Sequence, residues 1–451
     1  GFETALASAT LTNVARRDPY NSNHKMSFAQ LEALAPAYDW KGAFRLLHVA
    51  ATGPVNVAQP EFLKAFNKQL EQAPLETWRT WLRWRVVNGR AQFLSKAFYD
   101  EWFHFDRTVL SGVAQPQARW KVCVSSTDAT LGEALGRLYV EKHFPPEAQR
   151  RMQQLVANMR AALGEELQSA DWLAPETRRN ALRKLATFDP RIGYPVKWRD
   201  YAGVEVSRGS YLADKESALV WERKYRASKI GQKLDRTEWS MTPPTVNAYY
   251  SPPRNSITFP AGILQPPFFD MDADDAVNYG AIGVVIGHEM GHGFDDQGSK
   301  YDADGNLKNW WTDQDRAKFE ARAACVVNQF DSIDVGEGLH HTGKLVAGEA
   351  MGDLGGVTLA YKAYHRSLNG REPPVIGGLT GDQRFFLAYA RVWAQSQRAA
   401  AMRRQLATNP HPLGKYRTNA TLQNVPEFHR AFGCKPGDPM VRPPREQCRL
   451  W

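Results

Sequence analysis

Two histidines four residues apart, His288 and His292, constrain the fold of this chain more than any other feature of its sequence. Residues 276–287, which lead into them, are mostly apolar and contain no proline, as in a buried helix. On one face of an α-helix the two imidazoles would lie about 6 Å apart along the axis and could bind one Zn²⁺ ion. Glu289 would then lie beside the position left for a water molecule. A chance match to the pattern, expected about once in a hundred such chains, is the alternative.

A site with two histidines needs a third protein ligand, which is usually a carboxylate in hydrolytic zinc enzymes. Glu349 and Asp353 are four residues apart in a segment that we expect to be helical over residues 345–364, so both carboxylates point the same way. One of them can bind the metal while the other accepts a hydrogen bond from a ligating histidine. Asp313 and Asp315 are rival ligands, but their segment is typical of the start of a helix, which favours Glu349.

Glycines in the carboxylate segment predict how closely it packs. Gly352, Gly355 and Gly356 each cost a helix about 1 kcal/mol relative to alanine. A close approach between this helix and the one that carries the histidines would offset that cost.

Several longer motifs surround these residues. They are residues 136–141, 246–251, 259–269, 285–296, 348–356 and 409–417, and the ending at residues 448–451. Together they closely resemble the neprilysin and endothelin-converting-enzyme family of zinc endopeptidases, in collinear order over most of the chain. The resemblance implies an α+β, mainly helical protein in which an all-helical domain caps a thermolysin-like zincin catalytic domain. In the family, these domains enclose a chamber that admits oligopeptides and excludes folded proteins.

The resemblance implies a role for each residue of the metal site. His288, His292 and Glu349 would hold one Zn²⁺ ion per chain. Glu289 would be the general base that takes a proton from the attacking water and passes it to the leaving amine. Asp353 would orient His288, the first of the two zinc histidines.

Two residues near the C-terminus are implied in the same chemistry. His411 would stabilise the developing oxyanion, and Arg417 would bind a carbonyl group of the substrate backbone. Taken by itself, a histidine between two prolines is more typical of a surface turn, so only the resemblance assigns His411 this role.

A hairpin is expected shortly before the metal helix. Residues 245–251 and 256–259 are rich in strand-forming residues, and residues 252–255 have the composition of a turn. The edge of such a hairpin could bind an extended peptide by strand addition. The resemblance implies that Asn247 and Ala248 contact the substrate backbone.

The resemblance also implies a hydrophobic pocket for the substrate residue that follows the cleaved bond. Its walls would be Ile263, Phe268, Val285 and Trp393, so we expect cleavage before apolar residues. The same four residues would serve equally well as ordinary core residues, and the sequence does not distinguish the two interpretations.

Length and composition fit a globular protein of two or three domains. The chain has 451 residues, of which 43% are hydrophobic and 23% charged. No apolar run approaches the roughly 18 residues of a membrane span, so we expect no membrane span in this chain. The net charge is +9, but lysines and arginines are scattered rather than clustered with aromatic residues. This distribution favours a solvated basic surface, and no nucleic-acid partner is expected.

The chain is expected to divide near residue 220. Residues 1–220 contain mainly helical patterns and would form the capping domain. Residues 221–451 contain the hairpin and both metal-site helices and would form the catalytic domain. The chain starts at Gly1 without a methionine or a targeting segment, and relative to the family it lacks part of the N-terminal region. That missing segment of the same protein is a candidate partner.

The four cysteines indicate in which cellular compartment the protein could occur. The resemblance pairs Cys325 with Cys448, and it matches Cys123 and Cys434 to cysteines whose partners lie in the missing region. Ala394 replaces another family cysteine, so that bridge is absent. Disulfides would indicate an extracytoplasmic location, whether periplasmic, secreted or at the cell surface, while buried free thiols are the alternative.

The resemblance therefore implies a zinc-dependent endopeptidase that hydrolyses oligopeptides, on the amino side of hydrophobic residues. Trimming of peptide ends by the same centre is one alternative. A peptide-binding homologue with a structural zinc and no turnover is another, although a binding protein would need neither Glu289, His411 nor Arg417. A nucleic-acid-binding protein is a distant third.

Overall fold

The computed structural model describes residues 2–50 and 53–450. The chain forms two compact units, one from residues 1–131 with 199–236 and the other from residues 132–198 with 237–451. None of the helices in the described ranges combines the length and the apolar composition that crossing a membrane requires.

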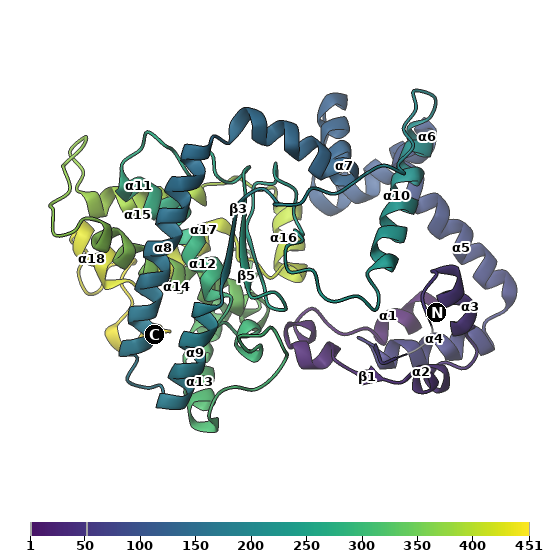
Figure 1. Cartoon of the computed structure of the whole chain (residues 1–451), viewed down its shortest axis with the longest axis horizontal. Helices are drawn as coiled ribbons and strands as arrows, with labels where there is room; N and C mark the ends of the chain where they lie inside the picture. Colours follow the sequence, from purple (N-terminus) through teal and green to yellow (C-terminus); the bar gives the residue numbers. More distant parts are fainter. Residues whose placement is uncertain (1, 51–52, 451) are drawn as a thin grey trace. The chain divides into compact units, whose positions relative to one another are not determined.

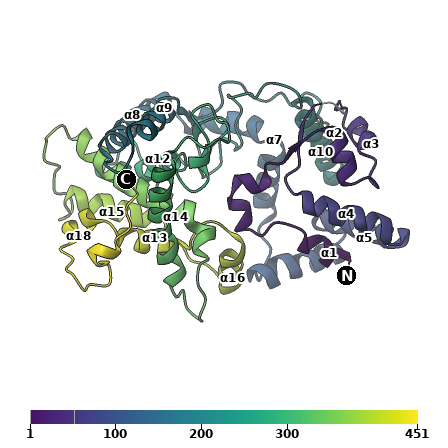
Figure 2. The same cartoon turned by 90° about the horizontal axis from the view of Figure 1, so that it is seen from below.

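The regular secondary structure of the first unit is almost all helical. Its helices are α1 (Phe2–Ser8), α2 (Phe28–Leu34), α3 (Trp40–Leu46), α4 (Pro60–Gln72), α5 (Leu75–Arg90), α6 (Lys96–Trp102), the first part of α7 (Arg119–His143) and α10 (Tyr211–Ser228). A π-helical segment, Phe103–Val109, follows α6, and two short strands, β1 (Lys25–Met26) and β2 (Val55–Asn56), pair antiparallel. Helices α1 and α2 both pack against α4 (Figure 2).

The second unit holds a small sheet and the metal-site helices (Figure 1). Its helices are the rest of α7, α8 (Pro146–Ser169), α9 (Pro175–Ala186), α11 (Asp275–Asn278), α12 (Val284–Gly291), α13 (Asp313–Ser332), α14 (Gly343–Ser367), α15 (Gly381–Val392), α16 (Ala399–Thr408), α17 (Gly414–Leu422) and α18 (Pro426–Phe432). Three strands lie in the order β3 (Asp189–Gly193), β5 (Ser256–Pro260) and β4 (Tyr249–Ser251). Strand β3 runs parallel to β5, and β4 runs antiparallel to it. The mainly helical α+β fold class is confirmed.

The hairpin predicted before the metal helix is present in a shorter form. Strands β4 and β5 pair with Tyr249 opposite Thr258. Asn255, in the turn, has a φ of 48°, a left-handed conformation that asparagine tolerates better than most residues. Residues 245–248, which the sequence assigned to the first strand, lie outside β4.

The metal helix runs from α11 through a π-helical segment, Tyr279–Gly283, into α12. Asp274 caps its start, because its side chain accepts a hydrogen bond from the backbone N–H of Ala276. Every residue from 278 to 290 is buried. This burial explains the apolar run that precedes His288, and the predicted buried helix is confirmed.

Helices α12 and α14 approach closely because glycines lie at their contact. A Cβ atom at Gly287 would lie 2.8 Å from Cα of Gly356, and a Cβ atom at Gly356 would lie 2.7 Å from the carbonyl oxygen of Val284. A Cβ atom at Gly352 would lie 2.7 Å from Nδ1 of His288. Because real Cβ atoms do not come this close to such neighbours, the contact requires glycine. The close approach predicted from Gly352 and Gly356 is confirmed.

The two compact units differ from the single division near residue 220 that the sequence suggested. Helices α8 and α9 precede residue 220 but belong to the second unit, where α8 packs against α14 and β3 joins the sheet. Helix α7 passes from one unit to the other at Leu131, whose φ of −125° and ψ of 34° interrupt the helix. An amphipathic helix buries one face in either kind of domain, so its pattern does not indicate which unit it joins. The division into capping and catalytic domains stays a prediction.

Cys325 and Cys448 form the disulfide that the resemblance implied, which ties α13 to the C-terminal segment. Cys123 is exposed and Cys434 is half-buried, and both are free within the described part of the chain. Their pairing with cysteines outside this sequence stays a prediction.

The variant Gly356→Ala tests the contact between α12 and α14. The new methyl group would press on the Val284 carbonyl and on the backbone of His288, so we expect a loss of about 1–3 kcal/mol in the free energy of unfolding and weaker metal binding. Urea unfolding and metal titration measure the two effects.

Gly164→Ala on α8 is the matched control for this substitution. Its methyl group would meet only the Leu185 side chain, at 3.7 Å, and alanine is favoured in a helix by up to about 1 kcal/mol. Equal effects of the two substitutions would contradict a glycine-dependent contact.

Candidate metal centre

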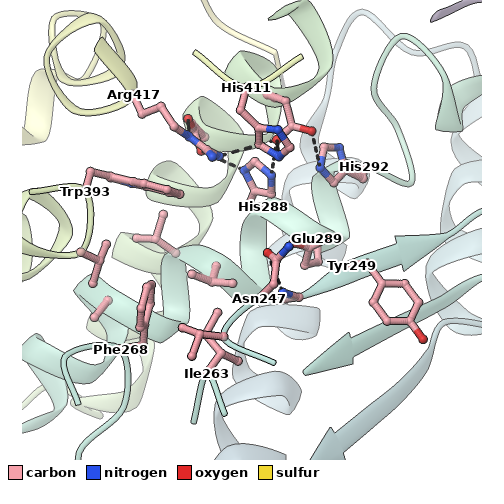
Figure 3. Close-up of a pocket in the computed structure, with 18 of the residues that line it drawn as sticks. Asn247, Tyr249, Ile263, Phe268, His288, Glu289, His292, Trp393, His411 and Arg417 are labelled. Carbon is pink, nitrogen blue, oxygen red and sulfur yellow. Dashed lines mark hydrogen bonds and ion pairs between the residues drawn. The ribbon is translucent and has the colours of Figure 1, made fainter. Parts of the chain in front are cut away.

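Helix α12 presents His288 and Glu289 to a cavity, and His292 follows as its C-cap residue (Figure 3). His288 and Glu289 are buried, and His292 is half-buried. One ligand atom from each of the three residues lies within 4.8 Å of the others. The two imidazole rings are nearly perpendicular, with centroids 4.4 Å apart.

Glu349 of α14 completes a three-residue donor set. Its Oε2 lies 3.2 Å from Nε2 of His288, and its Oε1 lies 3.8 Å from Nε2 of His292. Corners of a tetrahedron with zinc–ligand bonds of 2.0–2.1 Å are about 3.4 Å apart, so these separations fit zinc. The rival residues Asp313 and Asp315 lie in the first turn of α13, as their sequence context predicted.

The charges around His288 suit a cation. Burial by itself lowers the pKa of His288, but hydrogen bonds with Asp353 and Glu349 outweigh burial and raise the pKa to about 10. Burial by itself raises the pKa of Glu349, but His292 and His288 hold it well below its ordinary value. The carboxylates around His288 therefore create a negative charge that a proton on the imidazole or a metal ion must balance. A bound metal ion would displace that proton.

Glu289 lies beside the donors in a different environment. Burial raises the pKa of its carboxyl above the ordinary value, and the positive charge of His292 and His288 opposes the increase. Within residues 2–50 and 53–450, no group donates a hydrogen bond to the buried Oε2 atom of Glu289. An unpaired buried carboxylate oxygen is costly, so this environment fits a water molecule at a metal ion better than a structural ion pair.

Each of the two histidines has a carboxylate of its own beside Nδ1. Nδ1 of His288 lies 2.9 Å from Oδ1 of Asp353, and Nδ1 of His292 lies 2.8 Å from Oδ2 of Asp295. Such contacts set the tautomer of a ligating imidazole and raise its basicity. The sequence analysis assigned Asp353 but missed Asp295. The available signal was its position three residues after His292, in the turn that ends the helix.

Lys184 of α9 is a second residue that the sequence analysis missed. Its side chain is fully buried, and Nζ donates to the carbonyl oxygens of Gly298 and Tyr301, each at 2.7 Å. Because the backbone N–H of Gly298 donates to Asp295, Lys184 holds the turn that orients His292. Burial lowers the pKa of Lys184 to about 7, with Asp295 opposing the decrease. In the sequence, nothing separates this lysine from the exposed basic residues of the same helix.

His411 and Arg417 reach the site from the chain around the start of α17. Nε2 of His411 lies 3.2 Å from Oε2 of Glu349, and the imidazole is 46% exposed. Arg417 is buried and donates from Nε and Nη2 to the two carboxylate oxygens of Asp353, each at 2.7 Å. Its guanidinium carbon lies 3.8 Å from the ring centroid of Trp393, a cation–π contact.

A cavity of about 550 Å³ joins these groups to the predicted substrate residues. The predicted residues that line it are Asn247, Ala248, Ile263, Phe268, Val285, His288, Glu289, His292, Glu349, Asp353, Trp393, His411 and Arg417. Figure 3 shows Ile263, Phe268 and Trp393 on the side of the cavity away from His292. Ile263 and Val285 line the cavity and also belong to the hydrophobic core, and their role in binding a substrate residue stays a prediction.

Two models of peptidase family M13 match the chain, one over residues 247–448 and the other, for the N-terminal part of the family, over residues 1–195. The crystal structure of zinc metalloprotease ZMP1 of Mycobacterium tuberculosis in complex with an inhibitor is similar, with a TM-score of 0.95 and 42% sequence identity. That comparison covers 100% of this chain and 69% of the other. The chain belongs to peptidase family M13.

Other relatives are similar to this chain over its whole length. PepO from Lactobacillus rhamnosis has a TM-score of 0.90 at 30% identity, over 100% of this chain and 70% of that chain. Endothelin-converting enzyme 1 of Mus musculus is 35% identical over 467 residues, and neprilysin-3 of Drosophila melanogaster is 34% identical over 473 residues. The chain spans 60% of the length of each of these two proteins. The resemblance seen in the motifs is confirmed, and the cofactor that the donor set and the M13 family indicate is Zn²⁺.

The variant Asp353→Ala tests the orientation of His288. Removing the carboxylate leaves Nδ1 of His288 without its acceptor and leaves Arg417 only the more distant Glu349, at 3.7 Å, so we expect zinc affinity to fall by roughly 10- to 100-fold. Competition with a chromogenic chelator measures the affinity. The control is Asp382→Ala, which removes a carboxylate from His365 outside the cavity and should leave zinc affinity unchanged. A similar affinity in both variants would contradict the role of Asp353.

Proposed function

We propose that this M13 chain is a zinc-dependent endopeptidase that hydrolyses oligopeptides on the amino side of hydrophobic residues. The proposal depends on the convergence, in one cavity, of three metal donors, the buried carboxylate Glu289 and the pair His411 and Arg417. A protein that only bound peptides would need the cavity but would gain nothing from a buried carboxylate of raised pKa beside the metal donors.

The chemistry divides between the metal and the chain. His288, His292 and Glu349 would hold the zinc ion, which would supply Lewis-acid chemistry for the scissile carbonyl and the attacking water. Glu289 takes a proton from the attacking water and delivers it to the nitrogen of the leaving amine. Burial supports this role, because the raised pKa of the carboxyl brings it closer to the pKa of the groups with which it exchanges the proton.

His411 and Arg417 stabilise the charge that develops on the substrate. His411 stabilises the oxyanion. This role is supported by its position, because its Nε2 lies 3.2 Å from Oε2 of the metal donor Glu349. Arg417 binds a carbonyl group of the substrate backbone. Its paired hydrogen bonds to Asp353 and its contact with Trp393 hold the guanidinium before substrate arrives, so little side-chain entropy is lost on binding.

The substrate binds in an extended conformation along β4. Within the described residues β4 pairs only with β5, so it is an edge strand, and Asn247 and Ala248 precede it along the cavity. Strand addition there provides main-chain hydrogen bonds that do not depend on the peptide sequence. Selectivity for an apolar residue after the cleaved bond comes from the apolar wall of Ile263, Phe268, Val285 and Trp393.

We also infer an extracytoplasmic location. The Cys325–Cys448 disulfide supports it, because disulfides persist mainly in oxidising compartments.

The variant Glu289→Gln tests the general base. It keeps the size of the side chain but cannot accept the proton, so we expect turnover to fall by about 10²- to 10⁴-fold while one zinc ion per chain stays bound. Quenched-fluorescent peptides measure turnover, and mass spectrometry of the products locates the cleaved bonds. Glu427→Gln, at a half-buried residue that pairs with Arg430 and does not line the cavity, is the isosteric control and should keep full activity.

The cleavage pattern distinguishes the alternatives. Internal cuts before apolar residues, lost in Glu289→Gln, support the proposal. Products that come only from peptide ends would indicate end-trimming. A zinc-loaded wild type that binds the peptides without cleaving them would overturn the proposal in favour of a peptide-binding protein.

The variant Phe268→Ala tests the apolar pocket. Loss of the ring should lower kcat/KM for peptides with leucine or phenylalanine after the cleaved bond by roughly 10- to 100-fold, with a smaller effect for alanine. Competition between peptides in one reaction measures the ratio. Phe432→Ala, at an exposed position of α18, is the control. A uniform loss for all peptides would show that Phe268 acts only in packing.

A further inference from the structure

His341 lies two residues before α14 and does not line the cavity, yet it contacts the segment that carries His411. Its side chain is buried, with 4% exposure, and Nε2 accepts a hydrogen bond from the backbone N–H of Leu413 at 3.2 Å. The rings of Phe330 and Tyr416 stand nearly perpendicular to the imidazole, with centroids 5.6 and 5.3 Å away. Packing and a hydrogen bond therefore fix this side chain in one orientation.

Leu413 connects the two groups proposed to stabilise charge on the substrate. It is the N-cap residue of α17, and its carbonyl oxygen accepts from the backbone N–H groups of Tyr416 and Arg417 at 2.8 and 3.1 Å. His411 lies two residues earlier, separated only by Pro412. A shift of Leu413 would move both His411 and the start of the helix that carries Arg417.

The other side chains that hold this segment come from nearby in the chain. Asn409 accepts a hydrogen bond from the backbone N–H of His411, and Gln405 donates to the carbonyl oxygens of His411 and Pro412. Proline has no N–H group, so the next backbone donor after His411 is that of Leu413. His341 accepts from that donor across a separation of 72 residues and from the chain that leads into α14, the helix of Glu349.

A histidine can accept this hydrogen bond only while its Nε2 is unprotonated. Burial, with a smaller contribution from the neighbouring His340, lowers the pKa of His341 to about 4. The imidazole is therefore neutral over the range in which zinc peptidases can act, with its proton on Nδ1. An apolar side chain of the same size would fill the space but leave the N–H of Leu413 without an acceptor.

We propose that His341 is a positioning residue for peptide hydrolysis, which sets His411 and Arg417 against Glu349 through its hydrogen bond to Leu413. The inference rests on the proposed function, because it concerns the same site. It assigns His341 no contact with the substrate.

Two substitutions of similar length separate packing from hydrogen bonding. His341→Gln keeps an acceptor that can reach the N–H of Leu413, whereas His341→Met fills similar space without one. In the zinc-loaded protein we expect His341→Met to lower kcat by roughly 10- to 100-fold, because small displacements of catalytic groups have effects of this size. KM should rise by less, through the shift of Arg417, and zinc content should not change. His341→Gln should keep most of the activity. His340→Met, at the exposed neighbouring histidine, is the control.

A double-mutant cycle tests whether His341 acts through His411. In a His411→Ala background, His341→Met should cost much less in kcat than it does in the wild type. Equal losses in kcat for His341→Met and His341→Gln, or an undiminished loss in the His411→Ala background, would overturn the proposal.

Hydrogen exchange at the amide of Leu413 tests the hydrogen bond without turnover. Exchange should be slow in the wild type and in His341→Gln, and faster in His341→Met. If the wild type does not cleave peptides, the proposed function fails, while this exchange pattern still supports the link between His341 and Leu413. Equal exchange in all three proteins would overturn that link.

Discussion

The close contact between α12 and α14 is the constraint on which the rest of the site depends. Gly287 and Gly356 lie against each other's helices, and Gly352 lies against the imidazole of His288. The close approach of the two helices brings the carboxylate of Glu349 to 3.2 Å from the imidazole of His288. With side chains at the contact, helix axes normally stay 8–10 Å apart, and long side chains would have to span the difference with loss of rotamer entropy. Because glycine lets α12 and α14 lie close together, ligand side chains from two rigid helices can meet without extended, flexible conformations.

Charge balance is the second requirement, because nearly all of these groups are buried. Asp353 is 1% exposed and lies between Nδ1 of His288 and the guanidinium of Arg417. An unpaired carboxylate at such a depth would be strongly destabilising, whereas the paired one orients the imidazole and holds the guanidinium. One carboxylate therefore couples His288, a proposed metal ligand, to Arg417, the residue proposed to bind substrate. Near His292, the buried Lys184 donates a hydrogen bond to the carbonyl oxygen of Gly298, whose backbone N–H donates to Asp295. Lys184 thus stabilises the turn that contains Asp295.

Prediction from the sequence succeeded where the chemistry is local. The spacing of His288 and His292, the spacing of Glu349 and Asp353, and the glycines of α14 each follow from helix periodicity, and the structure confirms the helices that carry them. It failed where a contact joins distant segments. Lys184 and His341 lie on amphipathic or irregular segments that look ordinary in the sequence, and they acquire their surroundings from residues about 70 to 120 positions away. The same limit explains α8 and α9, whose apolar faces fit a helical domain as well as they fit α14.

The sequence by itself determined which residues could bind a metal and accept a proton, because the ligand spacing on a helix is a property of the backbone alone. It also determined the family, through motifs that keep their order along the chain. Only the tertiary structure decided which acid lies beside which histidine, which basic residues are buried, and where His411 and Arg417 lie relative to Glu349. The physical reason is that burial, pKa and hydrogen-bond partners arise from packing between elements, and helix or strand periodicity specifies only which face of each element is available to pack.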